Sequence, residues 1–277
     1  MAEFLLIASA LLHALWNAQA KRASSPSLQV LGILIFSALF SLAFLPFFPG
    51  ESFPNKWALI WAGAAGLFEA GYVISLAASL ERSPLGLSYT IMRGGAMLTV
   101  WFLSVLFFDE RFNYLTSIGV GVLFLGLFFT TYAKNWREVF SIWPYLCALF
   151  IAGYHIFYDL SLSRGSNPAS LFSFSLWIAL PALFIYHGKN KFQRLKQHFH
   201  LSPIMMMLGG LVCTLSFILF LMGLSITGAG LALSLRNSSV IFAQIFALMI
   251  GEKISWRQWF GAFLVALGCV LVNYSVS

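Results

Sequence analysis

Apolar runs long enough to cross a membrane follow one another along almost the whole chain. A transmembrane helix needs about 20 apolar residues to span the hydrocarbon core. Only 9% of the residues are charged and 60% are hydrophobic, whereas about 25% of a soluble domain is charged. The sequence therefore predicts an all-α integral membrane protein with ten transmembrane helices. The expected spans are 4–21, 28–48, 57–79, 85–107, 113–133, 144–163, 168–187, 203–224, 229–250 and 256–275.

The first apolar run ends in the stretch HALWNAQAKR, residues 13–22, whose small residues at Ala18 and Ala20 resemble a signal-peptide cleavage site. The segment before this run carries Glu3 and no Lys or Arg, whereas a signal peptide begins with positive charge. Further spans also follow it. We therefore expect residues 4–21 to be retained as the first spanning helix.

The sequence repeats itself weakly when it is shifted by 142 residues. The shift places His13 on His155 and aligns several loop residues, and Arg93 and Arg236 match within one residue. Each half then holds five spans, in residues 1–135 and 143–277. Because five is odd, the second half enters the membrane from the opposite side, which predicts two inverted repeats. Secondary transporters with this arrangement bind substrate near the midplane between the repeats.

The distribution of Lys and Arg in the loops indicates the orientation in the membrane. The loops after odd-numbered spans carry eleven of these residues and the loops after even-numbered spans carry three. This bias places the odd loops in the cytoplasm and both termini on the outer face of an inner (plasma) membrane. The basic segment 187–200 is expected to be a solvated loop near anionic lipid. The cations are scattered along the chain, which gives no indication of nucleic-acid binding.

The paired five-span halves, the stretch HALWNAQAKR and a glutamate after the fourth and ninth spans resemble the drug/metabolite transporter superfamily. These glutamates are Glu110 and Glu252. The ten-helix EamA-like transporters look most similar, and the likeness covers essentially the whole chain. It implies a central cavity that carries small molecules such as amino acids or other metabolites. Many relatives have a proline in the fourth and ninth spans, where this chain has Arg93 and Arg236, and this departure favours recognition of a charged solute.

Four charged residues stand out inside the predicted spans, away from the loop cations at the span ends, namely Glu69, Arg93, Asp159 and Arg236. A charge within a bilayer is costly, so it faces a partner or a wet cavity. Arginine presents donors that suit a carboxylate or phosphate. These residues are therefore candidates for substrate binding. The alternative is structural, with Glu69 paired to Arg93 and Asp159 paired to Arg236.

Other polar and aromatic side chains complete the predicted substrate site. His13, Trp16 and Asn17 lie within one turn of the first span, and His155, Tyr158 and Asp159 repeat that geometry in the second half. Hydrogen bonding between helices is the alternative role for these groups. Tyr72, Tyr89 and Asn237 are further candidates. We expect no metal or other cofactor, and we expect Cys147, Cys213 and Cys269 to be free buried thiols.

The glycines of the fifth and tenth spans also match between the halves, which predicts close helix packing between halves or between protomers. These residues are Gly119, Gly126, Gly261 and Gly268.

The function expected from these features is secondary transport of a small polar, charged or zwitterionic metabolite by alternating access. No Walker motif for ATP hydrolysis is present, so transport would draw on a gradient. Export is favoured by family analogy, with Glu69 as a candidate for proton coupling, in a monomer or homodimer. The alternatives are a lipid-carrier translocator or a non-transporting membrane subunit. An intramembrane enzyme is disfavoured because the usual catalytic motifs are missing.

Overall fold

The computed structural model describes residues 1–107, 114–132, 141–188, 191–201, 203–227 and 229–274. Within these ranges the regular elements are helices, which confirms the prediction of an all-α protein. Glu110 lies outside the described residues. The elements are α1 (Ala2–Arg22), α2 (Pro26–Phe44), the 3-10 helix η1 (Leu45–Phe47), α3 (Lys56–Arg82), α4 (Leu85–Phe107), α5 (Tyr114–Tyr132), α7 (Trp143–Leu162), α8 (Pro168–Tyr186), α9 (Lys191–Leu201), α10 (Pro203–Thr227), α11 (Ala229–Arg236), α12 (Ser239–Met249) and α13 (Trp256–Tyr274).

Seven segments in the described part of the chain are both long and apolar enough to span a membrane. They are Pro26–Phe47, Lys56–Arg82, Tyr114–Thr131, Trp143–Leu162, Pro168–Tyr186, Pro203–Thr227 and Leu231–Met249. Helices α1 and α4 have comparable lengths, of 21 and 23 residues. Helix α13 is apolar as well, but its described apolar stretch, Trp256–Val272, is shorter.

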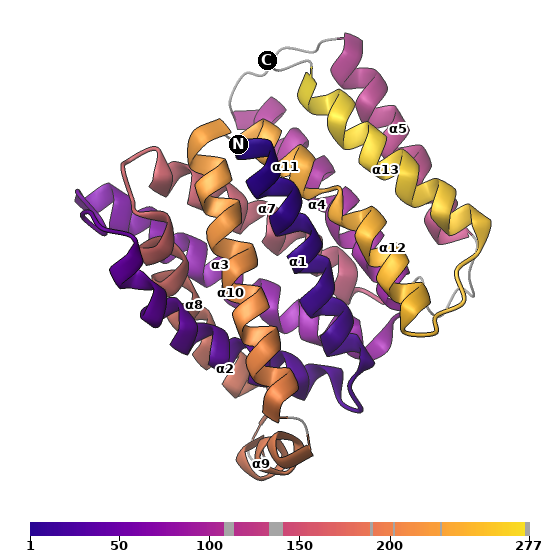
Figure 1. The fold of residues 1–277 in the computed structure, drawn as a ribbon. Coiled ribbons are helices and arrows are strands. Elements are labelled where there is room, and N and C mark those ends of the chain that lie inside the picture. The colour runs from indigo at the N-terminus through magenta and orange to yellow at the C-terminus, as the bar shows by residue number, and fades with distance from the viewer. Residues whose placement is uncertain (108–113, 133–140, 189–190, 202, 228, 275–277) are drawn as a thin grey trace.

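Helices from the two halves of the chain interleave in the bundle (Figure 1). Helix α1 packs against α10 and α12, α3 packs against α7 and α8, and α5 pairs with α13 at one corner. The start of α1 and the end of α13 lie at the same end of the bundle, and α9 lies at the opposite end. Each half therefore buries its helices largely against the other half.

The α5–α13 pair is close because glycines line its interface. A Cβ atom on Gly126 would lie 2.7 Å from the Val265 backbone nitrogen and 2.8 Å from the Gly261 carbonyl oxygen. A Cβ atom on Gly261 would lie 2.6 Å from the Gly126 carbonyl oxygen. Gly119 and Gly268 have similarly close backbone neighbours. The predicted close packing is confirmed, and it joins the two halves of one chain.

The prediction of a loop over 187–200 is wrong for most of that segment, because Lys191–Leu201 forms helix α9. The segment is amphipathic: Leu195, His198 and Phe199 recur at helical spacing among exposed cations. Phe199 stacks on Phe36 of α2, with ring centroids 5.9 Å apart. The His198 Nε2 lies 2.9 Å from the Gln29 Oε1, and burial lowers the pKa of His198. These contacts dock α9 against α2.

The ninth predicted span is also not the continuous helix expected over 229–250. Helix α11 ends at Arg236, and α12 begins at Ser239 after a turn at Asn237 and Ser238. The Ser238 hydroxyl donates to the Leu235 carbonyl at 2.6 Å, and the Ser238 N–H donates to the same carbonyl at 3.1 Å. Serine and asparagine side chains compete for backbone groups in this way and tighten or break helices. In the first half, by contrast, α4 runs through Arg93 without interruption.

The turn between α3 and α4 is held by two charged side chains. Glu252, in the loop after α12, accepts hydrogen bonds from the Leu85 and Gly86 backbone N–H groups at 2.6 and 3.2 Å. Lys21 at the end of α1 donates to the Leu80 and Ser83 carbonyls at 2.7 and 2.8 Å. Each charge has the sign that stabilises the helix terminus it meets. We call this set of contacts the α3–α4 clamp.

Gly126→Ala should lower the thermal unfolding midpoint of the purified protein, because the added methyl group meets backbone atoms of α13. Overpacking of this kind costs about 1–3 kcal/mol. The matched control is Gly121→Ala on the same helix, where a Cβ atom meets nothing within 4 Å. The control should unfold at the same temperature or higher, since alanine favours the helix by about 1 kcal/mol. Equal midpoints for the two variants would contradict the close-packing interpretation.

Glu252→Ala should also lower the unfolding midpoint, because it leaves two N–H groups of α4 without their acceptor. Losing a helix N-terminal cap costs about 0.5–2 kcal/mol. Glu81→Ala serves as the control: Glu81 is exposed and sits in the last turn of α3, where a negative charge gives no stabilisation. Thermal melts followed by tryptophan fluorescence measure both. A midpoint for Glu252→Ala that matches that of Glu81→Ala would show that the cap contributes nothing.

Candidate functional site

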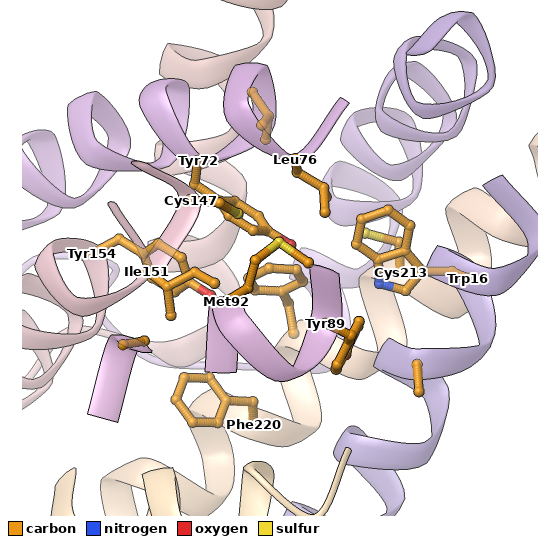
Figure 2. Close-up of a cluster of buried hydrophobic side chains, with 14 of the residues drawn as sticks. Trp16, Tyr72, Leu76, Tyr89, Met92, Cys147, Ile151, Tyr154, Cys213 and Phe220 are labelled. Atoms are coloured by element: carbon orange, nitrogen blue, oxygen red, sulfur yellow. The ribbon is translucent and has the colours of Figure 1, made fainter. Parts of the chain in front are cut away.

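Most of the predicted site residues meet in the buried interior of the bundle, where helices from both halves converge. Figure 2 shows Trp16, Tyr72, Tyr89, Tyr154 and Phe220 around this region, each from a different helix. The residues that we call the central cluster are all buried. They are His13 and Trp16 of α1, Glu69 and Tyr72 of α3, Tyr89 and Arg93 of α4, Tyr154, His155 and Tyr158 of α7, and Arg236 of α11.

His13 is a hydrogen-bonding centre within this cluster. Its Nδ1 lies 3.2 Å from the Arg236 Nη2 and 3.4 Å from the Trp16 Nε1. The Ser216 hydroxyl lies 3.4 Å from the same nitrogen, and the Tyr72 hydroxyl lies 3.3 Å from Nε2. Arg and Trp can only donate. The geometry therefore assigns Nδ1 as the acceptor of a neutral ring, with the proton on Nε2 facing Tyr72.

Glu69 is held by hydroxyl groups from two other helices. Its Oε2 accepts from the Tyr158 hydroxyl at 2.6 Å and from the Ser175 hydroxyl at 2.7 Å. Those two hydroxyl oxygens lie 2.8 Å apart. In the described ranges Glu69 makes no ion pair, so the alternative structural bridge to Arg93 is not formed.

The two arginines of the cluster lie against aromatic rings. The guanidinium carbon of Arg236 lies 3.8 Å from the ring centroid of Phe220 and 4.9 Å from that of Phe217. The guanidinium carbon of Arg93 lies 5.5 Å from the ring centroid of Tyr89. Such contacts supply a modest cation–π attraction. Neither arginine forms an ion pair with an acidic residue of the described chain.

Several polar atoms of the cluster are buried without a hydrogen-bond partner in the described structure. They are Arg93 Nη2, Arg236 Nε and Nη1, the Tyr89 and Tyr154 hydroxyls and His155 Nε2. Unpartnered buried polar groups are rare and costly in packed proteins. Their concentration where polar and aromatic side chains of five helices meet is the arrangement expected of a binding site whose ligand completes the hydrogen bonds.

Three predicted site residues are not brought into these contacts. The Asn17 amide donates to the His13 carbonyl of its own helix at 2.7 Å, and the Asn237 amide lies 3.1 Å from the Cys269 Sγ. Asp159 is only partly buried, and its side chain takes no part in the cluster contacts described above. The alternative ion pair between Asp159 and Arg236 is therefore absent from the described structure.

The structure adds residues that sequence reasoning missed. Tyr154 stacks on His155 with ring centroids 4.4 Å apart and lies 5.2 Å from Tyr72. Its spacing of four from Tyr158 places both on one helix face, so this signal was present. Phe217, Phe220, Ser175 and Ser216 gave no distinctive signal among many phenylalanines and serines in apolar runs.

The donor set does not indicate a metal centre. No group of three His, Cys, Asp or Glu side chains is placed to hold a metal ion within the residues searched, which are the described ones. Cys147, Cys213 and Cys269 are free and buried, as predicted.

Comparison with known proteins identifies the family. The pattern of the EamA-like transporter family matches twice, over residues 1–132 and 140–274. No curated protein matches the chain. Twenty-eight chains of solved structures match. One of them, a crystal structure, superposes with a TM-score of 0.64 at 16% identity, over 100% of this chain and 98% of its own. At that identity the likeness concerns the fold alone.

The family match therefore agrees with the apolar helices and with the resemblance noted in the sequence. The chain is a multi-pass membrane protein that belongs to the EamA-like transporter family, within the drug/metabolite transporter superfamily.

Proposed function

We propose that the protein is a secondary transporter of a small polar, charged or zwitterionic metabolite, and that the central cluster binds this solute. The observation that carries the proposal is the set of unpartnered polar atoms buried between helices of both halves. A purely structural core would satisfy these atoms internally. A bound solute can form hydrogen bonds with these atoms, and water can replace the solute when it is released.

The transport cycle that suits this arrangement is alternating access. Ten spans, in residues 1–135 and 143–277, would form inverted repeats that rock against each other around the cluster. Residues of α1, α3 and α4 come from the first half, and residues of α7 and α11 come from the second. A relative movement of the halves would therefore separate the ligand-binding groups. One chain supplies all of them, so a monomer is sufficient and a homodimer would carry two sites.

The orientation expected from the loop charges would put the α3–α4 clamp at the cytoplasmic end of an inner (plasma) membrane. Lys21 and Glu252 would then bind the α3–α4 turn to the ends of α1 and α12 on the cytoplasmic side. A small cavity of about 400 Å³ lies beside the turn and is lined by charged residues of both halves, among them Arg82 and Lys253. In an exporter, solute would enter from the cytoplasm here once the clamp opens.

A lipid-carrier translocator is not supported by the lateral cavity between α4, α5 and α7. Such a protein needs a sideways opening that leads lipid headgroups to polar residues. A lateral cavity of about 580 Å³ lies between α4, α5 and α7 and includes the exposed rings of Phe102, Phe124 and Phe128. The described residues that line it include no charged side chain. This surface suits contact with acyl chains, as is ordinary for a membrane protein.

Glu69 is the group through which we expect protons to be coupled to transport. It is buried, carboxylic and linked to α7 and α8 through the hydroxyls of Tyr158 and Ser175. Gaining or losing a proton would change which partner donates in these hydrogen bonds. The proton would thereby alter contacts between the two halves.

Glu69→Gln should abolish the acceleration of transport by a pH gradient while leaving exchange of labelled solute for unlabelled solute. The amide cannot take up or release a proton but retains hydrogen bonding. The measurement is uptake into proteoliposomes with and without an imposed pH gradient. Glu51→Gln, at an exposed loop position, is the control and should behave as the unaltered protein. A pH-gradient response that persists in Glu69→Gln removes Glu69 from the coupling role. Failure of every polar solute to move, in the unaltered protein, argues against transport itself.

A further inference from the structure

Two permanent cations lie in the membrane interior of this protein without a counter-ion among the described residues. Arg93 and Arg236 are 2% and 0% exposed. The guanidinium of Arg93 lies over the Tyr89 ring, and that of Arg236 lies over the Phe217 and Phe220 rings. An uncompensated buried charge is among the most destabilising features a core can contain. The charges therefore have a role that internal packing does not explain.

The nearby acidic residue does not neutralise these cations by direct contact. The Oε2 of Glu69 is occupied by two hydroxyl donors. Among the described residues, the Arg236 guanidinium makes its one polar contact with the Nδ1 of His13, which is a neutral acceptor. Donors on both guanidinium groups consequently remain available.

The unpartnered groups are predominantly hydrogen-bond donors. Arg93 Nη2 and Arg236 Nε and Nη1 can only donate, and the hydroxyls of Tyr89 and Tyr154 can donate as well. A ligand that satisfies them must supply several acceptor lone pairs. A carboxylate or phosphate does so, and it also supplies the missing negative charge. An amine or a sugar hydroxyl does not supply both.

We propose that the central cluster recognises the oxyanion of its solute, a carboxylate or a phosphate, between Arg93 and Arg236. The remaining part of the solute lies against the aromatic walls formed by Tyr72, Tyr154, Phe217 and Phe220. This inference rests on the proposed function and narrows it to anionic or zwitterionic solutes. Glu69 is a proton-linked residue in this arrangement, and it is not the group that holds the anion.

The binding test uses the purified full-length chain in detergent and four probes at equal ionic strength. The probes are inorganic phosphate, succinate, the diamine putrescine and glucose. Phosphate and succinate should raise the thermal unfolding midpoint, and putrescine and glucose should not. Phosphate also stabilises proteins non-specifically by exclusion from their surface, so the informative quantity is the difference between variants. A larger shift with succinate assigns a carboxylate solute, and a larger shift with phosphate assigns a phosphorylated one.

The variants are Arg93→Gln, Arg236→Gln and the double substitution, with Arg194→Gln as the matched control. Arg194 is an exposed arginine of α9, so its loss removes one positive charge outside the cluster. Each cluster variant should weaken apparent anion affinity at least tenfold, and the control should retain it. Arg93→Lys and Arg236→Lys keep the charge and should retain part of the affinity. If the glutamine variants fail to fold, the lysine variants decide the result.

A second measurement uses no ligand. Arg236→Met should raise the unfolding midpoint of the empty protein, because it removes an uncompensated buried charge and keeps much of the side-chain volume. A structural arginine would give the opposite result. Arg194→Met should leave the midpoint unchanged.

The inference is overturned if the anions raise the unfolding midpoint of the double variant as much as that of the unaltered protein. It is also overturned if only the neutral or cationic probes stabilise the unaltered protein, or if Arg236→Met lowers the unfolding midpoint. These outcomes are independent of transport. Anion binding without transport would refute the proposed function and leave the oxyanion site. Transport of neutral solutes that is unaffected by the arginine substitutions would refute the oxyanion site and leave the transport function.

Discussion

The burial of two arginines away from any acidic partner is the constraint on which the rest of the described interior depends. Aromatic rings lie over both guanidinium groups, and a neutral histidine accepts from one of them. Each of these contacts is weaker than an ion pair. The protein thus holds its positive charge in place without neutralising it. An environment of this kind favours anion binding because the guanidinium groups are already desolvated before the anion arrives.

The same interior is shared between the halves of the chain, and this explains the pattern of packing around it. Glycines bring α5 and α13 together through backbone contacts, so that pair is tightly packed. The contacts near the cluster and at the α3–α4 clamp include many hydrogen bonds, between side chains or between side chains and backbone. Hydrogen bonds of modest net strength can exchange for water or ligand. The fold therefore combines a tightly packed helix pair with interfaces that can reorganise.

Much of this could be predicted from the sequence, and the limits have physical causes. Apolar runs and the loop residues between them predicted the helices. Because charges are rare within a membrane, Glu69, Arg93 and Arg236 could be identified as candidate site residues. The hydrogen-bond partners of these residues could not be predicted. Those of Glu69, for example, are hydroxyl groups from distant spans that resemble many others in the sequence. The break after Arg236 was missed because hydropathy averages over a whole span, whereas the turn depends on local competition by Ser238 for a backbone carbonyl.

That break has a consequence for how the molecule deforms. The fourth span is a continuous helix, whereas its counterpart in the second half is two short helices joined by a turn. A continuous helix transmits a tilt along its whole length, and a jointed one can bend locally while its ends stay docked. The fourth and ninth spans therefore differ in how they can bend, although the same family pattern matches both halves. If the halves move against each other as proposed, a stiffer fourth span and a more compliant ninth span would give unequal energy barriers for opening toward the two faces of the membrane.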